Sequence, residues 1–169
     1  MEIKKKHNFF LEGPISPQNI ADSIASHSRK KNIGAHQIFM GQVRADVIDG
    51  KTVAAIDYTS YTEMAEKEME RIRENCIVKH NLTCAHVKHS LGKVNAGEIC
   101  FFVFVSSPHR QAAFDACEEM VNLIKKEVPI FGKEVFEDES HQWKENTDTK
   151  SRHEKQTRIT RISTNELKC

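Results

Sequence analysis

The segment from Ser106 to Arg110, SSPHR, holds the residues of this 169-residue chain that are best suited to binding an anion. An apolar run precedes it, and Ser107 and Pro108 fit the N-cap and the first position of a helix. Free backbone N–H groups at a helix start attract negative charge. His109 and Arg110 add two side-chain donors, and an arginine suits the bidentate recognition of a phosphate. The alternative is an ordinary capped helix with two exposed polar residues.

Two lysines, Lys125 and Lys126, stand near the end of the same predicted helix. On a helical wheel Lys125 lies roughly 60° from the centre of the apolar stripe that runs from Phe114 to Val128, and Lys126 lies roughly 160° from it. Lys125 should therefore be partly buried, which would favour its neutral form and suit it to proton transfer. Lys126 should be solvated. The alternative for Lys125 is a cation that only stabilises the end of the helix.

Further charged residues stand where strands or helices are expected to end. Arg44 ends a predicted strand just before a loop, so it can present its guanidinium group to a ligand, although such arginines are common on protein surfaces. Lys133 lies between Gly132 and Glu134, in a segment that Pro129 separates from the preceding helix. The alternative at Lys133 is a solvated ion pair with its neighbour.

The nine histidines do not have the spacing of a metal site. His86 and His89 are three positions apart on a predicted strand, so they should face opposite ways. The sequence contains no HExxH and no paired CxxC ligands. It also lacks a Walker loop, a GxGxxG motif and a nucleophile elbow. We therefore expect no metal and no cofactor, and the residues alone predict an anion-binding domain without naming its reaction.

The elements that must position these residues can be predicted from periodicity, caps and turns. Three helices are expected, at 16–32, from a capping box at Ser60 and Glu63 onward, and at 107–128. Four strands are expected, at 35–44, 52–61, 83–90 and 98–106, the first two joined by a turn at Asp49 and Gly50. This order predicts an α+β domain with a largely antiparallel sheet.

The composition is that of a soluble globular protein, with 29% charged residues and a formal net charge of +1. This balance gives no general electrostatic reason to expect nucleic acid or an acidic membrane as a partner. The longest apolar run, 99–105, is too short to span a membrane. The five cysteines form no CxxC and no export signal is evident, so we expect reduced thiols and a cytoplasmic location, with Cys76 and Cys117 in the core. We expect one domain, 1–144, and a polar, disordered tail, 145–169.

Several motifs together resemble the family of molybdopterin synthase large subunits. The stretch SSPHRQAAFDAC is followed by KKEVPIFGKE and then by FED with a nearby tryptophan. Upstream stand IGAHQIFMGQVR, YTSYTEM and HSLGKVNAGE, so the likeness covers about residues 9–145 in the family's order. The resemblance implies an α/β hammerhead-like fold with an added small antiparallel sheet, and a homodimer within a heterotetramer.

The resemblance also implies a reaction and a partner. The partner is a small ubiquitin-like sulfur carrier whose C-terminal Gly-Gly tail ends in a thiocarboxylate. Two sulfurs pass from the carrier to cyclic pyranopterin monophosphate, which makes the dithiolene of molybdopterin in molybdenum cofactor biosynthesis. The enzyme would thus be a sulfurtransferase that needs no nucleophile of its own.

The family's functional residues can be transferred to matching positions of this chain. Lys125 matches the lysine closest to the chemistry, a proton donor and acceptor beside the carrier's terminal glycine. Glu134 matches an acidic residue that follows. The remaining matches are substrate contacts at Gln42, Val43, Arg44, His109 and Arg110.

One position departs from the family pattern. Gly132 stands where the family has a second active-site lysine. Our hypothesis is that Gly132 lets the loop turn so that Lys133 supplies the missing charge. In addition, Thr147 stands near the place of a basic residue that the family supplies from the dimer partner, and Lys144 or Lys150 could substitute for it.

Two other functions compete with this interpretation. The first is a non-catalytic module that docks the carrier's tail, which Gly132 favours. The second is a nucleotide- or RNA-binding domain, which would need a basic stripe with exposed aromatic residues that the sequence does not contain.

Overall fold

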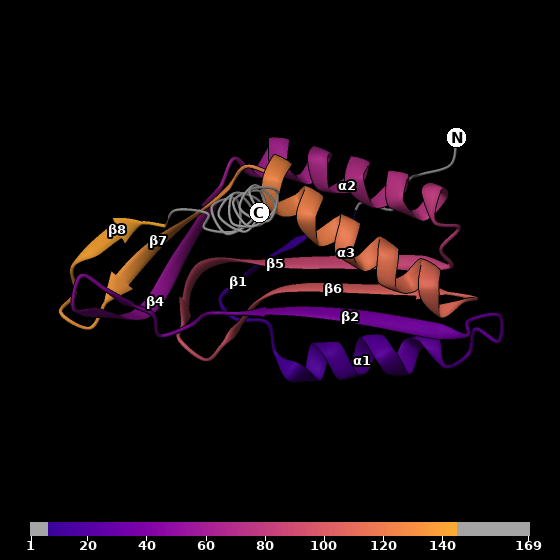
Figure 1. Ribbon diagram of the computed structural model, residues 1–169, viewed down its shortest axis with the longest axis horizontal. Helices are drawn as coiled ribbons and strands as arrows, with labels where there is room; N and C mark the ends of the chain where they lie inside the picture. The colour runs from indigo at the N-terminus through magenta and orange to yellow at the C-terminus, as the bar shows by residue number, and fades with distance from the viewer. Residues whose placement is uncertain (1–6, 145–169) are drawn as a thin grey trace, which may run out of the picture.

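Three helices cover a largely antiparallel sheet in the computed structural model, which describes residues 7–144 (Figure 1). The predicted tail at 145–169 lies outside the described residues. The α+β class and the antiparallel sheet are confirmed, although β1 pairs with β5 in parallel. In chain order the elements are β1 (Phe10–Glu12), α1 (Pro17–His27), β2 (Ala35–Gln42), β3 (Val47–Ile48), β4 (Lys51–Ser60), α2 (Thr62–Lys79), β5 (Cys84–Asn95), β6 (Ile99–Ser107), α3 (Arg110–Glu127), β7 (Ile130–Phe136) and β8 (His141–Trp143).

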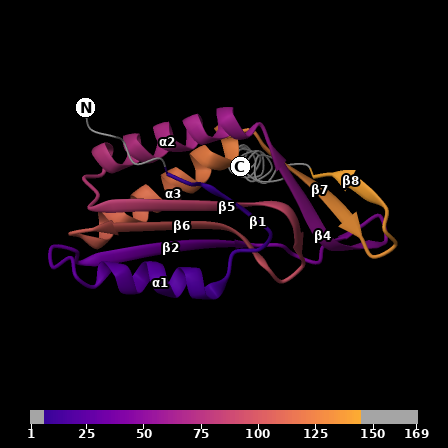
Figure 2. The same ribbon diagram turned by 180° about the vertical axis from the view of Figure 1, so that it is seen from behind.

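The central strand β6 is covered on both faces, as its uninterrupted apolar sequence predicts. Side chains of alternate residues such as Val103 and Val105 join the larger core, to which α2 and α3 contribute. Phe102 and Phe104 point the other way and pack with Ile20 of α1. Figures 1 and 2 show the result, with α2 and α3 on one side of the sheet and α1 on the other.

Strand β5 connects the main sheet to a smaller group of strands. It pairs with β6 through residues 84–89 and with β4 through residues 92–95. At the start of the second stretch Gly92 has φ +72°, a conformation that L side chains rarely adopt. The change of partner lets β4, β7 and β8 continue the sheet beyond the ends of α2 and α3 (Figure 1). The junction between the two parts positions the site described below.

The start of α3 differs from the prediction. Its N-cap is His109 rather than Ser107, and the helix begins at Arg110. Ser107 instead extends β6, because its carbonyl accepts a hydrogen bond from the N–H of Gly34 at 3.1 Å. Pairing with the neighbouring strand β2 therefore takes precedence over local capping, and Pro108 lies before the helix.

The predicted buried face of α3 is confirmed at Cys117, Val121, Ile124 and Val128, but the observed face is rotated to one side of it. Phe114 is 49% exposed, although the apolar stripe predicted it to be in the core. The small residues Ala113 and Ala116 face the sheet instead, together with Met120, and all three are completely buried. This rotation of the buried face moves Lys125 further from the core than the wheel predicted.

Other boundaries shift for similar reasons. Helix α1 ends at His27, several residues before the expected end, and Arg44 lies just outside β2. The capping box at Ser60 and Glu63 is not formed, because the N-cap is Tyr61 and no side chain caps it. The predicted buried face of α2 is confirmed at Ala65, Met69, Ile72 and Cys76. None of the helices within residues 7–144 is long and apolar enough to cross a membrane.

Candidate active site

A cleft of about 530 Å³ opens at the junction of the two parts of the sheet, beside the end of α3. The strands β2, β4, β5 and β6 provide its floor, and α3, β7 and the end of β8 provide its walls. Its lining comprises Gly41, Gln42, Tyr58, His89, Cys100, Phe101, Ile124, Lys125, Lys126, Glu127, Val128, Pro129, Ile130, Phe131, Gly132, Trp143 and Lys144.

The floor carries polar groups that are neutral at neutral pH. The hydroxyl of Tyr58 donates a hydrogen bond to Sγ of Cys100 at 3.3 Å, and burial raises the pKa of both groups. The His89 ring packs edge-on against Tyr58, with 5.0 Å between ring centroids. Burial lowers the pKa of His89 to about 4, so its imidazole is uncharged. The charge of the cleft therefore comes from its walls.

Those walls are cationic. Lys125, Lys126 and Lys144 all line the cleft. The acidic residue of the lining, Glu127, forms an ion pair with Arg71 of α2 at 2.6 Å, which offsets its negative charge. Three ammonium groups around a neutral floor form a site for an anionic ligand.

Two of the lysines are close enough to the floor of the cleft to affect the pKa of the Cys100 thiol. The positive charges of Lys144 and Lys125 both oppose the rise that burial causes in the pKa of Cys100. The Nζ atom of Lys125 also lies 5.9 Å from the centroid of the Phe39 ring. Lys125 is exposed rather than half-buried, because the buried face of α3 is rotated away from it. Lys125 lines the cleft, and the prediction that it is partly buried is wrong.

The motif at 42–44 is divided between three environments. Gln42 lines the cleft. Val43 is 2% exposed and packs in the core, so its side chain cannot reach a ligand. Arg44 lies on the surface, where its guanidinium group donates to the Asp46 carboxylate at 3.0 Å.

The hypothesis of a turn at Gly132 is wrong. Gly132 lies within the regular strand β7, opposite Tyr58 of β4. Lys133 is therefore on the other face of the strand, where its Nζ lies 3.7 Å from a carboxylate oxygen of Asp57, and it does not line the cleft. Glu134 is 5% exposed, outside the lining, and accepts a hydrogen bond from the side-chain amide of Gln142 at 3.0 Å.

Another lysine lies beside Gly132 instead. The backbone N–H of Lys144 donates to the Gly132 carbonyl at 2.8 Å, and Lys144 is part of the cleft. Lys126, Tyr58, His89 and Cys100 also line the cleft and were not predicted as site residues. Lys126, Tyr58 and His89 lie in the motifs KKEVPIFGKE, YTSYTEM and HSLGKVNAGE. The pairing of β4, β5 and β6, which no local pattern reveals, brings Tyr58 and His89 together with Cys100.

His109 and Arg110 lie at the opposite end of α3 from Lys125. Both are exposed. Fifteen helical positions separate Arg110 from Lys125, which corresponds to ~22 Å along the helix axis. Within one chain the pair therefore does not share the cleft with the lysines.

The sequence and the fold both match known proteins. The family model described as MoaE protein matches residues 11–127. The molybdopterin synthase catalytic subunit of Pyrococcus abyssi is 39% identical over 125 residues, which are 74% of this chain and 82% of the relative. The crystal structure of molybdopterin synthase from Staphylococcus aureus superposes with a TM-score of 0.71 at 29% identity, over 82% of this chain and 96% of that chain.

A more distant structure has the same fold. It is the complex of subunits 1 and 2 of the molybdopterin-converting factor from Helicobacter pylori, with a TM-score of 0.70 and 18% identity over 82% of this chain and 90% of that one. The matches in sequence are long and similar enough to assign this chain to a family. This chain belongs to the MoaE family, the catalytic subunits of molybdopterin synthase.

Proposed function

We propose that the cleft beside Lys125 is the place where sulfur passes from a thiocarboxylated carrier to cyclic pyranopterin monophosphate in the cytoplasm. Two such transfers make the dithiolene of molybdopterin. The observation that carries the proposal is the group of three lysines, Lys125, Lys126 and Lys144, around an uncharged floor. A phosphorylated pterin and a thiocarboxylate are both anions, and fixed cations are needed to bring them together.

Lys125 is the proposed proton donor and acceptor of the reaction. It lies over the floor formed by Tyr58, His89 and Cys100, and it is the lysine that matches the family's reactive position. After the carrier's sulfur has bonded to the pterin, water adds to the carbonyl carbon of the carrier, and an ammonium group there can stabilise the oxyanion that exists until the C–S bond breaks. Because the sulfur comes from the carrier, the cysteine on the floor need not act as a nucleophile.

The rim of the cleft suits the arrival of a partner's tail. Tyr61, Phe131 and Trp143 are 67%, 44% and 63% exposed. Tyr61 and Phe131 contact each other edge-on, with ring centroids 5.7 Å apart, and Phe131 and Trp143 also line the cleft. Exposed aromatic residues of this kind are typical of protein interfaces. We propose that the C-terminal Gly-Gly segment of a small ubiquitin-like carrier enters here, as the two-subunit complex from Helicobacter pylori suggests.

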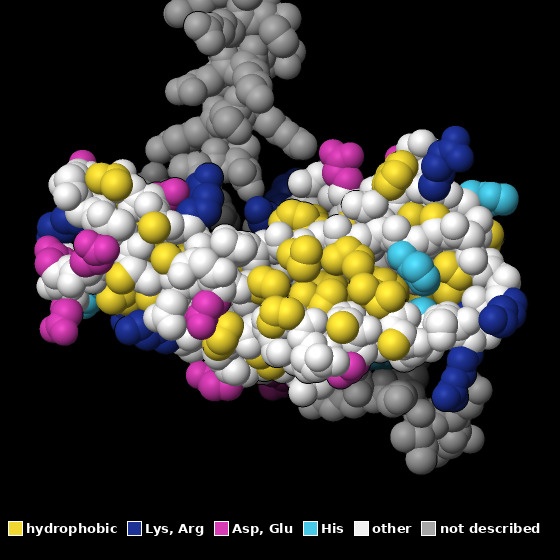
Figure 3. Space-filling model, turned by 90° about the horizontal axis from the view of Figure 1, so that it is seen from below, with side chains coloured by type: hydrophobic (Ala, Val, Ile, Leu, Met, Phe, Trp, Pro, Cys, Tyr) yellow, Lys and Arg dark blue, Asp and Glu magenta, His cyan; other side chains and the backbone are white. Residues whose placement is uncertain are grey.

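We further propose a homodimer of this hammerhead-like subunit, within a heterotetramer. Figure 3 shows a broad apolar area on the side where β2 lies in Figure 1. Met40 of β2 and Phe114 of α3 are 52% and 49% exposed. An apolar surface beside an edge strand favours pairing with a second copy.

A dimer of this kind would bring the separated cations together. β2 and α3 both run from the His109 end of the molecule to the cleft, since Gly34 contacts Ser107 and Gly41 lines the cleft. A two-fold axis across the middle of these elements reverses their direction in the second copy. The partner's His109 and Arg110 would then lie beside this chain's Lys125 and bind the phosphate.

The proposal predicts that replacing Lys125→Ala lowers the rate of dithiolene formation by about 100-fold or more. The assay combines the purified complex, thiocarboxylated carrier and cyclic pyranopterin monophosphate. Lys67→Ala is the matched control, because Lys67 lies on α2 and pairs with Glu63 at 3.0 Å. Equal rates for the two variants would remove Lys125 from the chemistry.

The same assay tests the alternative of a docking module without turnover. Such a module would bind the carrier's tail and form no dithiolene in the unmodified protein. Gly132 was the observation in its favour, and Lys144 beside it now offers the charge that this position lacks.

A further inference from the structure

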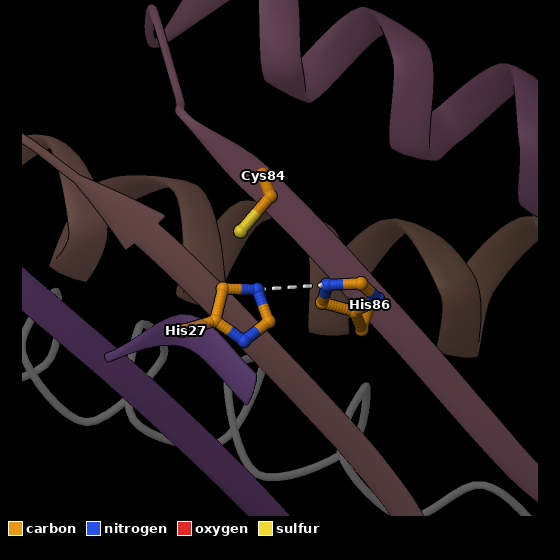
Figure 4. A group of neighbouring side chains, drawn as sticks. All are labelled: His27, Cys84 and His86. Atoms are coloured by element: carbon orange, nitrogen blue, oxygen red, sulfur yellow. Dashed lines mark hydrogen bonds between the residues drawn. The ribbon is translucent and has the colours of Figure 1, made fainter. Parts of the chain in front are cut away.

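On the face of the sheet that α1 covers, three side chains with metal-binding atoms meet. Cys84 and His86 are two positions apart on β5, so their side chains point to the same face. His27, the last residue of α1, lies above them. The helix and the strand are far apart in the sequence, and Figure 4 shows the three side chains pointing toward one another. His89, on the same strand, faces the cleft on the other side of the sheet.

The donor atoms are close together. Nε2 of His86 lies 3.1 Å from Nε2 of His27. One ligand atom from each of His27, Cys84 and His86 lies within 4.8 Å of the others. In a tetrahedral zinc site the nitrogen and sulfur ligands are about 3.3–3.7 Å apart, a difference that side-chain rotation closes.

A hydrogen bond to the backbone holds the His27 ring in the tautomer that can bind a metal ion through Nε2. Its Nδ1 lies 2.6 Å from the carbonyl oxygen of Ser23, and a carbonyl can only accept, so Nδ1 carries the proton. In the neutral ring Nε2 then has a lone pair, and that lone pair is directed at the cluster. A backbone carbonyl that holds the second nitrogen of a histidine is the usual outer partner of a metal ligand.

We propose that His27, Cys84 and His86 form a zinc site, with the fourth position open to water. Two imidazole nitrogens and one thiolate suit this ion, and Cys84 releases its thiol proton to solvent on binding. His27 is 6% exposed, whereas Cys84 is half-buried and His86 is exposed, so an ion can enter from the side of β5.

The bound ion would fasten α1 to the sheet. The buried residues of α1 are Ile20 and His27, a small contact for a helix of 11 residues. A zinc ion held by His27 and by two residues of β5 adds a link between the end of this helix and the sheet. The proposed role of the ion is to link α1 to β5, and the site is separate from the proposed sulfur transfer.

Binding of Co²⁺ and Zn²⁺ to the metal-free full chain tests this proposal. A thiolate-to-cobalt absorption band and the visible bands of a four-coordinate ion should appear and saturate at one ion per chain, and Zn²⁺ should displace them. Cys84→Ser should abolish the thiolate band. His86→Gln should weaken binding by more than the ~10–100-fold that is typical for losing an outer partner.

The controls separate this cluster from other ligands of the chain. His141→Gln should bind like the unmodified protein, because His141 is a described residue that does not belong to the cluster. Zn²⁺ should also raise the Tm of the unmodified protein and leave that of His86→Gln unchanged, a readout that remains if Cys84→Ser folds poorly. Saturation without a thiolate band, a thiolate band that persists in Cys84→Ser, or unchanged affinity in His86→Gln would overturn the proposal.

Discussion

The backbone N–H of Lys144 donates to the carbonyl of Gly132 at 2.8 Å, so a lysine from beyond β8 lies beside a position of the cleft that has no side chain. A larger residue would be crowded at this position. A Cβ on Gly132 would come within 3.0 Å of Cγ2 of Ile56 and 3.4 Å of Cε1 of Tyr58. The side chains of β4 therefore leave little room for a residue larger than glycine at position 132 of β7. The positive charge beside this position comes from Lys144 instead.

This relationship predicts that Lys144→Ala lowers the rate of sulfur transfer by about tenfold or more, because the cleft loses one of its fixed cations. Lys133→Ala is the matched control, since Lys133 faces Asp57 outside the cleft and its loss should leave the rate nearly unchanged. Single-turnover rates with thiocarboxylated carrier measure both. If Lys133→Ala lowered the rate of sulfur transfer and Lys144→Ala did not, Lys133 rather than Lys144 would be the lysine that acts in the cleft.

His89 predicts a dependence of stability on pH. Burial lowers its pKa to about 4 in the folded protein, against 6.5 for an exposed histidine, so the unfolded chain takes up the proton first as the pH falls. The contribution of His89 is therefore fully present above pH 6.5 and is lost as the pH falls toward 4, by about 3 kcal/mol. Urea unfolding between pH 7 and pH 4 should show this slope.

The matched variant is His89→Gln, whose amide can still donate to the Ser90 carbonyl that Nδ1 of His89 contacts at 2.8 Å. Its free energy of unfolding should fall less steeply over the same range, whatever its value at pH 7. Identical slopes for the two proteins would show that His89 is not the group that resists protonation.

The sequence predicts most elements of this fold because their signals are local. Apolar periodicity located α2, and the continuous apolar run located β6. The predictions are wrong where contacts with distant segments determine the local structure. One example is Ser107, which pairs with β2 instead of capping α3. The short strands β1, β3 and β8 have no periodicity of their own and form because a neighbour is available.

The site was predicted in part for the same reason. Lys125 was found from its place on the helix and from the family motif. Lys144 and His89 reach the cleft through the course of β8 and β5, which the sequence pattern does not specify. The cluster of His27, Cys84 and His86 was not predicted, because His27 is far from the other two residues in the sequence and the three form no spacing motif.

The apolar surface at β2 predicts that Met40→Asp converts the proposed dimer into a monomer, because a buried unpaired carboxylate is costly at an interface. Sedimentation velocity measures the change. Val78→Asp is the control, since Val78 is 82% exposed on α2, away from β2, and should leave the dimer intact. A dimer that tolerates Met40→Asp would place the interface elsewhere.

The central claim is that each cleft uses Lys125 of one protomer and the His109–Arg110 pair of the other. It is tested most directly by co-expressing Lys125→Ala and Arg110→Ala chains, each nearly inactive alone. In a mixed dimer one cleft carries both changes and the other carries neither, so random assembly should restore about a quarter of the unmodified activity. Activity that stays at the level of the separate variants would contradict a shared site.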